Sequence, residues 1–511
     1  MNANDSDLNP SVNPLKIPTM IGMLLLAIMI ILPLFMDVHH HGAEAGSEPA
    51  QTVVDAASPD SVDLTEPEDM VPDFWIIGTI PFACLLLSIA ILPLIPFTHH
   101  WWENNMNRLA MAIGLGWLTL FYYMYVEGFH GAVLAVEHAI PGEYIPFIML
   151  LFSLYVISGG ISITGDLRAT PMVNTIFLIV GTVIASFIGT TGASMLLIRP
   201  LLETNRERKH VVHTVVFFIF LVSNIGGSLL PIGDPPLFLG YLRGVPFEWT
   251  LTLWPQWLMA SVILLAVYFI WDKIAFSREL PAQIIHDKFE LRPLRMRGNF
   301  NLLLLLGVIL AVAFLDPSKT IPGTSWKPFM FMRELIMLGL AGLSLAITPK
   351  GIRESNRFNY HAIAEVAALF VGIFITMQVP LAVLKAYGAE LPIETPTHFF
   401  WITGMLSSFL DNAPTYLVFF ETADAMTTVD GPGVLTLTSG SLINEKLLIG
   451  ISLGAVFMGA NTYIGNGPNF MVKSIAEQSG VRMPSFFGYF FLAMIILVPV
   501  FILVNLVLIP S

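Results

Sequence analysis

Apolar runs long enough to cross a lipid bilayer follow one another along almost the whole chain. A helix that spans about 30 Å of hydrocarbon needs roughly 20 residues that are mostly apolar. Hydrophobic residues make up 55% of the 511 residues and charged residues only 12%. These features predict an all-α, polytopic membrane protein. The predicted spans are 17–36, 73–97, 108–128, 143–163, 210–242, 252–271, 299–315, 334–348, 361–384, 447–472 and 484–509.

Two of these runs are broken in the middle, and the two breaks match. Residues 226–238 read GGSLLPIGDPPLF, and residues 458–470 read MGANTYIGNGPNF. A constant offset of 232 positions aligns Gly227 with Gly459, Ile232 with Ile464, Gly233 with Gly465, Pro236 with Pro468 and Phe238 with Phe470. Glycine and proline interrupt helices, and inside a membrane an unwound backbone is tolerated only where it lines a cavity or is buried in protein. Paired breaks of this kind indicate the binding site of a transporter.

Two further apolar runs, 172–199 and 397–421, carry a polar break and are interpreted as re-entrant hairpins that return to the side they left. Cytoplasmic loops carry an excess of Lys and Arg. With the N-terminus inside, two hairpins place most of the 24 Lys and Arg residues in inside loops, including the basic loop 273–298. If both runs were ordinary spans, that loop would lie outside. The basic residues left outside are Arg243, Lys319, Lys327, Arg333, Lys385 and Lys446.

The two hairpins divide the chain into matching halves of opposite orientation. Glu143 precedes Thr190 by 47 residues, and Glu365 precedes Asn412 by 47 residues. This spacing predicts an inverted repeat in which each half has a span, a hairpin and a broken helix, as in many secondary transporters. The predicted units are an N-terminal membrane helix with an acidic extracellular loop (1–72), a first repeat (73–272), a basic cytoplasmic loop (273–298) and a second repeat (299–511).

The N-terminal segment has two interpretations. Residues 17–36 are about as long as a spanning helix, whereas the apolar core of a secretory signal peptide has roughly 7–15 residues. We therefore expect residues 1–36 to be retained rather than cleaved, with the N-terminus on the cytoplasmic side of a bacterial plasma (inner) membrane. Residues 37–73 hold ten acidic residues and no Lys or Arg, which is typical of a flexible, solvated loop.

Small, hydroxylated and amide residues gather at the four breaks. The first hairpin turns at 189–194 (GTTGAS) and the second at 410–415 (LDNAPT). Oxygen atoms in such turns can replace the hydration shell of Na⁺ or Li⁺, which are hard cations. The alternative is that these residues pack helices together, but their matching places in both halves favour an ion or substrate site. The candidate binding residues are Thr190, Thr191, Ser194, Ser223, Asn224, Ser228, Asp234, Asp411, Asn412, Thr415, Asn461, Thr462, Asn466 and Asn469.

Three carboxylates within the predicted spans and hairpins, Asp234, Asp411 and Glu365, are the candidates for proton coupling. A carboxylate in a medium of low dielectric binds either a proton or a cation, so H⁺ and Na⁺ can compete for the same oxygens. Asp234 aligns with Asn466, which gives one titratable and one neutral half. The structural alternatives are a helix N-cap for Asp411 and a turn residue ahead of Pro235 for Asp234. We expect Na⁺ to bind at Thr190, Asp234, Asp411, Asn412 and Asn466.

At these segments the sequence resembles the ion transporter superfamily, most of all the permeases grouped as ArsB/NhaD-type or citrate-transporter-like. The resemblance covers nearly all of residues 73–509. It is carried by GTTGASMLLIRP (189–200), SNIGGSLLPIGDPP (223–236), LDNAPT (410–415) and GANTYIGNGPN (459–469). It implies a scaffold domain, a mobile transport domain with two hairpins, a homodimer and Na⁺ sites at the hairpin tips.

Two branches of the superfamily imply different functions. Members of the NhaD-type branch exchange Na⁺ or Li⁺ for H⁺ and carry an Asp-Asn pair and a Gly-Asp pair, which match positions 411–412 and 233–234. The carboxylate symporters show Ser-Asn-Thr at both sites, and this chain has only the partial match Ser-Asn-Ile at 223–225. The first hairpin departs from the antiporter pattern, because Thr-Thr stands at 190–191.

We therefore predict a Na⁺(Li⁺)/H⁺ antiporter that works by alternating access and needs no cofactor beyond the transported ions. The alternative is a Na⁺- or H⁺-coupled transporter of citrate, a dicarboxylate or another anion, because helix N-termini and tip amides can hold a carboxylate without Arg. An enzyme is not expected, since the sequence has no zinc-ligand spacing, no Gly-x-Ser-x-Gly and no phosphate loop. The expected partners are the lipid bilayer, a second copy of the chain and a small inorganic cation, with a carboxylate as the alternative, and nucleic acid is not expected.

Overall fold

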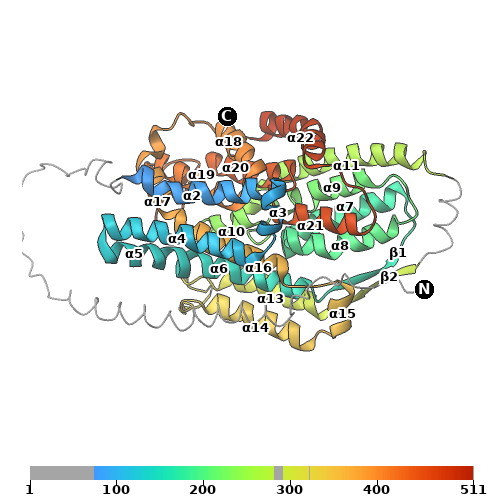
Figure 1. Ribbon diagram of the computed structural model, residues 1–511, viewed down its shortest axis with the longest axis horizontal. Helices are drawn as coiled ribbons and strands as arrows, with labels where there is room; N and C mark the ends of the chain where they lie inside the picture. The colour runs from blue at the N-terminus through green and yellow to red at the C-terminus, as the bar shows by residue number, and fades with distance from the viewer. Residues whose placement is uncertain (1–73, 281–291, 322, 510–511) are drawn as a thin grey trace, which may run out of the picture.

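In the computed structural model, residues 74–280, 292–321 and 323–509 are described. The predicted first span (17–36) and the acidic loop (37–72) therefore lie outside the described residues. Helices form nearly all of the regular structure in the described part of the chain (Figure 1), which confirms the all-α prediction. Five helices are long and apolar enough to cross a membrane, or up to seven if each of two bent helix pairs is one span. The protein is therefore a polytopic membrane protein.

The chain up to residue 280 forms a series of helices that is interrupted at several points. These elements are α2 (Trp75–Ile91), η2 (Leu92–Leu94), α3 (Pro96–Trp102), α4 (Asn105–Val126), α5 (Gly128–Glu137), η3 (His138–Tyr144), α6 (Ile145–Ser158), β1 (Ser162–Asp166), α7 (Pro171–Ile188), α8 (Thr190–Thr204), α9 (Val212–Leu221), η4 (Ile225–Ser228), α10 (Pro235–Leu242), η5 (Phe247–Leu253) and α11 (Trp254–Phe276).

The chain from residue 292 onward contains a similar succession of helices. These elements are β2 (Arg292–Arg297), α13 (Phe300–Phe314), α14 (Met332–Ile347), α15 (Lys350–Ser355), α16 (His361–Thr376), α17 (Gln378–Tyr387), η6 (Gly388–Glu390), α18 (Pro396–Phe409), α19 (Asn412–Met426), β3 (Val434–Thr436), β4 (Leu442–Asn444), α20 (Glu445–Met458), η7 (Gly459–Asn461), α21 (Gly467–Gln478) and α22 (Phe486–Leu508).

Two short pairs of strands accompany the helices and were not predicted. β1 pairs with β2 in antiparallel fashion, with Ser162 opposite Arg297, and β3 pairs with β4. β2 falls within the segment 273–298, which the sequence predicts as a basic loop. Because β1 and β2 are far apart in the chain, local periodicity carries no signal of their pairing.

The predicted span 143–163 belongs to a longer helix that begins earlier. Residues Gly128–Ser158 form one apolar helical stretch of 31 residues, in which η3 is a π-helical turn between α5 and α6. The prediction began this span too late, because His130, Glu137 and Glu143 interrupt the apolar run. Glu143 is nevertheless buried, since its carboxylate has an ion-pair partner in the folded protein.

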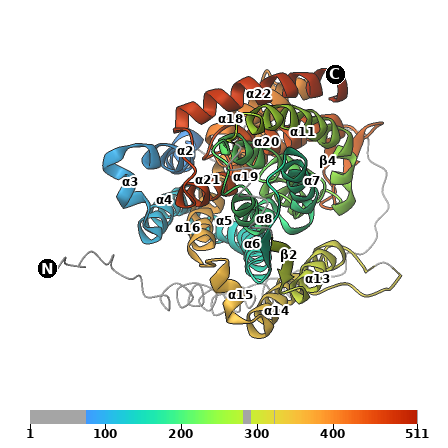
Figure 2. The same ribbon diagram turned by 90° about the vertical axis from the view of Figure 1, so that its right-hand side faces the viewer.

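The helices form two groups that differ in their contacts. In the peripheral group (α2–α6, α13, α14, α16 and α17), α4 packs against α2, α5 and α16, and α6 packs against α13, α14 and α16. In the break-bearing group (α7–α11 and α18–α22), α18 packs against α20, α7 against α8 and α11, and α10 against α19. The groups meet where α17 lies against α19, where α6 lies against α8 and α10, and where the Tyr241 hydroxyl of α10 donates to the carbonyl oxygen of Val312 in α13. α14 and α22 lie at opposite edges of the molecule (Figures 1 and 2).

α18 and α20 approach each other closely because two glycines of α20 face α18. A Cβ on Gly450 would lie 2.5 Å from the carbonyl oxygen of Pro396, and a Cβ on Gly454 would lie 2.5 Å from that of Phe400. Small residues allow helix backbones in membranes to come this close. α18, the first helix of the predicted hairpin 397–421, is thereby held against α20, the helix that leads into the second break.

Gly454→Ala is therefore expected to lower the thermal stability of the purified protein in detergent. The added methyl group must displace the backbone of α18, and overpacking of this kind costs about 1–3 kcal/mol. Gly339→Ala in α14 is the matched control, because no atom lies within 4 Å of the added Cβ. Unfolding followed by intrinsic fluorescence should show a lower midpoint for Gly454→Ala only, and equal midpoints would contradict the close contact.

Candidate functional site

The chain turns at Gly189, between α7 and α8. Gly189 has φ +79°, a conformation that residues with a side chain rarely adopt. α8 begins at Thr190, whose backbone N–H donates a hydrogen bond of 2.9 Å to the carbonyl oxygen of Gly233. The tip formed by α7 and α8 is thereby fixed against the break that follows α9.

A second turn, between α18 and α19, contains Asp411. Asp411 is the N-cap of α19, and its Oδ1 accepts a hydrogen bond of 3.1 Å from the Ala413 N–H. The Thr415 hydroxyl donates to the carbonyl oxygen of Asp411 at 2.9 Å. The N-cap role considered for Asp411 is thus present. It does not exclude ion binding, because the cap uses only one of the two carboxylate oxygens.

The breaks in the two broken helices have nearly the same backbone conformation. Asp234 has φ −144° and ψ 143°, and Asn466 has φ −153° and ψ 139°. Each residue precedes a helix with proline near its N-terminus. A Cβ on Gly233 or on Gly465 would collide with the carbonyl oxygen of the glycine six positions earlier. Glycine is therefore needed at both positions, and the residues aligned by the offset of 232 positions have similar backbone geometry.

The Asp234 carboxylate lies where both turns and the second break meet. Oδ1 accepts hydrogen bonds from the Thr190 hydroxyl at 2.9 Å and from the Asn466 amide at 3.0 Å. Oδ2 accepts one from the Asn412 amide at 2.7 Å. Asp234 is only 1% exposed. It therefore does more than shape a turn, since three segments distant in sequence bind the same carboxylate.

A chain of asparagine side chains joins the two breaks. The Asn466 amide also donates to Oδ1 of Asn224 at 3.2 Å, and the Asn224 amide donates to Oδ1 of Asn469 at 2.7 Å. The Asn469 amide in turn donates to the carbonyl oxygens of Gly459 and Thr462 at 2.8 and 2.9 Å. Carbonyl oxygens that the unwound backbone leaves without helical partners are thus satisfied by side chains.

Hydroxyl groups complete the contacts around the two turns. The hydroxyls of Ser194 and Ser223 lie 2.8 Å apart. The Thr462 hydroxyl donates to the carbonyl oxygen of Ser408 at 2.5 Å, and the Asn461 amide donates to the Ser408 hydroxyl at 2.9 Å. Each contact joins a turn to the break that follows it.

Two serines that contribute to the site were not identified from the sequence. The Ser186 hydroxyl donates to the carbonyl oxygen of Gly226 at 2.5 Å, and Ser408 makes the contacts described above. Both occur just before a turn. The signal was present, because the offset of 222 residues that aligns Thr190 with Asn412 also aligns Ser186 with Ser408.

Some predicted residues lie apart from the Asp234 carboxylate. Thr191 is half-buried and is not one of the donors to Asp234. The Ser228 hydroxyl donates within its own turn, to the carbonyl oxygen of Ile225. Glu365 forms an ion pair of 2.9 Å with Arg108 in α4, and its side chain is 36% exposed. Arg108 therefore compensates its negative charge.

The site offers mainly oxygen ligands. The three donors to Asp234 are neutral, although buried charges are normally paired with a charge or bound to a metal ion. Oδ1 of Asn412 and Oδ1 of Asn461 are buried acceptors with no hydrogen-bond partner among the described residues. A carboxylate held by a hydroxyl and two side-chain amides, with the free amide oxygen of Asn412 beside it, suits a hard cation such as Na⁺ or Li⁺.

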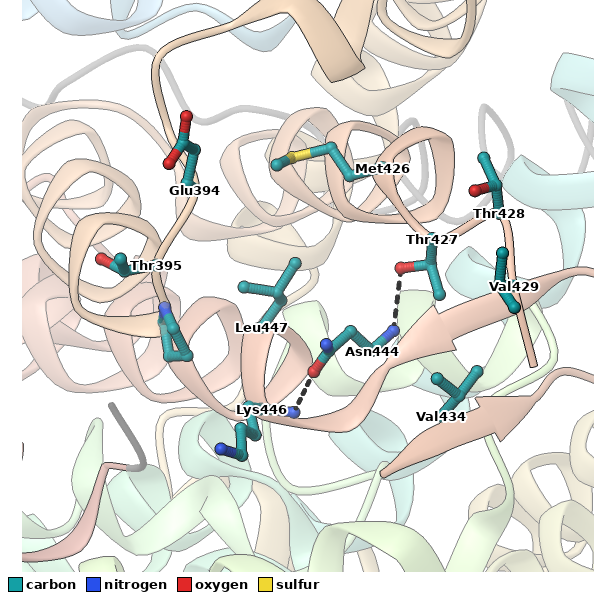
Figure 3. Close-up of a pocket in the computed structure, with 11 residues that line it drawn as sticks. Glu394, Thr395, Met426, Thr427, Thr428, Val429, Val434, Asn444, Lys446 and Leu447 are labelled. Carbon is teal, nitrogen blue, oxygen red and sulfur yellow. Dashed lines mark hydrogen bonds between the residues drawn. The ribbon is translucent and has the colours of Figure 1, made fainter. Parts of the chain in front are cut away.

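A cavity of about 520 Å³ lies elsewhere, between the start of α18, the end of α19 and the β3–β4 pair (Figure 3). Its lining includes Thr395, Thr427 and Lys446. Asn444 donates its backbone N–H to the Thr427 hydroxyl and accepts a hydrogen bond from the Lys446 N–H. None of the candidate binding residues lines this cavity, so it is separate from the cluster around Asp234.

Apolar spanning helices that are interrupted around a shared, buried polar cluster define a multi-pass membrane transporter. The chain belongs to a citrate-transporter-like permease family, because the family model CitMHS_2, described as "Putative citrate transport", matches residues 72–509. The resemblance found in the sequence is thereby confirmed at the level of the family. A search among curated proteins found no match.

Thr190→Val is expected to destabilise the folded protein, because it keeps the shape of the side chain and removes a donor to the Asp234 carboxylate. A hydrogen bond to a charged group contributes about 1.5–3 kcal/mol. Thr191→Val is the matched control next to it. Thermal unfolding in detergent should give a clearly lower midpoint for Thr190→Val than for Thr191→Val. Equal effects would mean that the hydroxyl contact with Asp234 contributes nothing.

Proposed function

We propose that this protein is a secondary active transporter that exchanges Na⁺ or Li⁺ for H⁺ by alternating access. The observation that carries the proposal is the buried Asp234 carboxylate, which is held by neutral side chains from both turns and the second break. A carboxylate in low dielectric gains from binding either a proton or a cation. Competition between the two for the same oxygens couples their movement in opposite directions.

The groups around Asp234 have the chemistry that this exchange requires. Asn412 donates to Asp234 through its amide nitrogen, while its Oδ1 has no hydrogen-bond partner within the described part of the chain. A cation bound there can therefore take one ligand from each side chain. The Thr190 hydroxyl can rotate from donating to Asp234 to presenting an oxygen lone pair to the cation. Asp411 supplies a second carboxylate at the neighbouring turn. A proton that neutralises Asp234 removes the negative charge that favours the cation.

A second candidate is Na⁺- or H⁺-coupled transport of citrate, a dicarboxylate or another anion. The description of the matching family favours it. The helices α8, α10, α19 and α21 all begin at the turns and breaks, and helix N-termini attract anions. The Asp234 charge disfavours it, because an anionic substrate would approach a buried carboxylate with no basic side chain among its hydrogen-bond partners.

We further propose the arrangement in the membrane that alternating access requires. The order α7–α8–α9–α10 is repeated by α18–α19–α20–α21, and the similar backbone at Asp234 and Asn466 supports two related halves in an inverted repeat. On this proposal the N-terminus is cytoplasmic, the membrane is the bacterial inner membrane, and the functional unit is a homodimer.

Transport in everted vesicles tests the proposed ion exchange. Vesicles from antiporter-deficient cells that express the protein should hold an imposed pH gradient until Na⁺ or Li⁺ is added, and the cation should then collapse it, as a pH-sensitive dye reports. The matched control is vesicles without the protein. If no alkali cation collapses the gradient while citrate uptake depends on Na⁺, the second candidate replaces the first.

Asn substitutions test whether the two aspartates act through their titratable charge or only through their place in the fold. Asp234→Asn and Asp411→Asn are both expected to abolish exchange, because an amide cannot take up and release a proton. Asp411→Asn should leave α19 intact, since Asn caps helices as well as Asp does. Expression in the membrane and unfolding temperature serve as controls. Wild-type exchange by either variant would show that its carboxylate acts only in the fold.

A further inference from the structure

A second cluster of buried charge lies at the C-terminal end of α10 and takes no part in the Asp234 site. Arg243 directly follows α10 and forms two ion pairs, one with Glu421 in α19 and one with Glu143 in the π-helical turn η3. The side chains of Glu143 and Glu421 are 7% and 8% exposed, and that of Arg243 is 20% exposed. The cluster therefore holds one positive and two negative groups in a largely buried setting.

Arg243 and Glu421 belong to one tightly packed unit. α10 lies so close to α19 that a Cβ on Gly240 would collide with the hydroxyl of Tyr416, and Tyr416 is only 1% exposed. Helices in such contact move together, because a packed core is not continuously deformable. The Arg243–Glu421 pair is therefore internal to the break-bearing group.

Glu143 belongs to the other group of helices. The next residue, Tyr144, donates its hydroxyl to the carbonyl oxygen of Ala367 in α16 at 3.0 Å. Phe147 stacks on Phe370 of the same helix, with ring centroids 4.7 Å apart. These contacts fasten η3 to the peripheral group. Glu143 also stands in a π-helical turn, a local irregularity that is rare and often found at functional positions.

The two ion pairs of Arg243 are thus unequal. A displacement of α10 relative to the peripheral helices breaks the pair with Glu143 and leaves the pair with Glu421 intact. Breaking a buried ion pair is costly when a charge is left without a partner, and Glu421 removes that cost for Arg243. Oε2 of Glu143 lacks a hydrogen-bond partner among the described residues, so this carboxylate is held through its Oε1 contact with Arg243.

We propose that the Arg243–Glu143 ion pair is a latch between the two helix groups, which closes in the state seen here and opens in each transport cycle. Glu421 keeps Arg243 paired while the latch is open. The inference rests on the proposed alternating access, which requires the break-bearing group to move relative to the rest. If the ion pairs served only the fold, neither glutamate variant would favour movement of the groups, and the two would be labelled alike.

The latch can be tested with a cysteine reporter at the contact between the groups. Gly388 follows α17 and faces α19, since a Cβ there would lie 3.2 Å from Cα of Thr422. Leu381 is seven residues earlier on the same helix face and is buried. Val379, by contrast, belongs to a separate apolar cluster with Tyr123 of α4 and Ala132 and Ala135 of α5. The chain has one cysteine, so Leu381→Cys in a Cys84→Ser background gives a single reactive thiol.

The experiment compares Glu143→Gln with Glu421→Gln, both in this reporter protein, purified in detergent and treated with a water-soluble maleimide. Because the open state is expected to be a minor one, Glu143→Gln should raise the labelling rate about tenfold by increasing its population. Glu421→Gln should change the rate by less than about twofold, since the link to the peripheral group remains. Both variants should lower the unfolding midpoint, because each leaves Arg243 with one carboxylate.

Equal labelling of the two variants, or no increase in Glu143→Gln, would overturn the latch. If Glu143→Gln does not fold, Glu143→Asp takes its place, because it keeps the charge and shortens the side chain by one carbon. Glu143→Asp should give a smaller increase in the labelling rate. An unchanged labelling rate in that variant would also overturn the latch. Labelling requires no transported ion. A labelling difference without cation/proton exchange in vesicles would therefore reject the proposed function and keep the latch, and the reverse result would reject only the latch.

Discussion

The hydrogen bonding of one buried carboxylate, that of Asp234, joins parts of the chain that are far apart in sequence. Thr190, Asn412 and Asn466 all donate to it. A buried charge without partners is expensive, so the two turns and the second break must stay together as long as the carboxylate is ionised. On the proposed exchange, a proton or cation that neutralises Asp234 would weaken this constraint and so link binding to the freedom of the surrounding helices.

The requirement that buried polar groups have partners also explains how the broken helices are tolerated in an apolar protein. The breaks after α9 and α20 leave carbonyl groups without helical partners. Asn469 and Ser186 take up some of these groups. The two breaks share a backbone conformation, yet one carries a carboxylate and the other an amide. The scaffold of the site is therefore close to symmetric, and its charge is not.

Much of this arrangement was predictable, because its signals are local or repeated. Apolar runs of spanning length predicted the all-α membrane fold. The offset of 232 residues aligned Asp234 with Asn466, and these two residues have nearly the same backbone conformation. Ser186 and Ser408 were missed because a single serine in an apolar helix carries no signal by itself; the signal lies only in the offset of 222 residues that pairs the two. The early start of the helix at Gly128 was missed because polar residues interrupt its apolar run.

The sequence by itself determined where helices run and where they must break, because hydrophobicity and the backbone limits of glycine and proline act within a few residues of each position. It also determined which break carries the charge. Only the tertiary structure decided that Thr190 and Asn412 donate to Asp234, that Glu365 is paired with Arg108, and that Arg243 binds carboxylates from two different helix groups. These contacts join side chains separated by 44 to 257 positions in the chain, and which of many polar groups meet is settled by helix packing rather than by any local pattern.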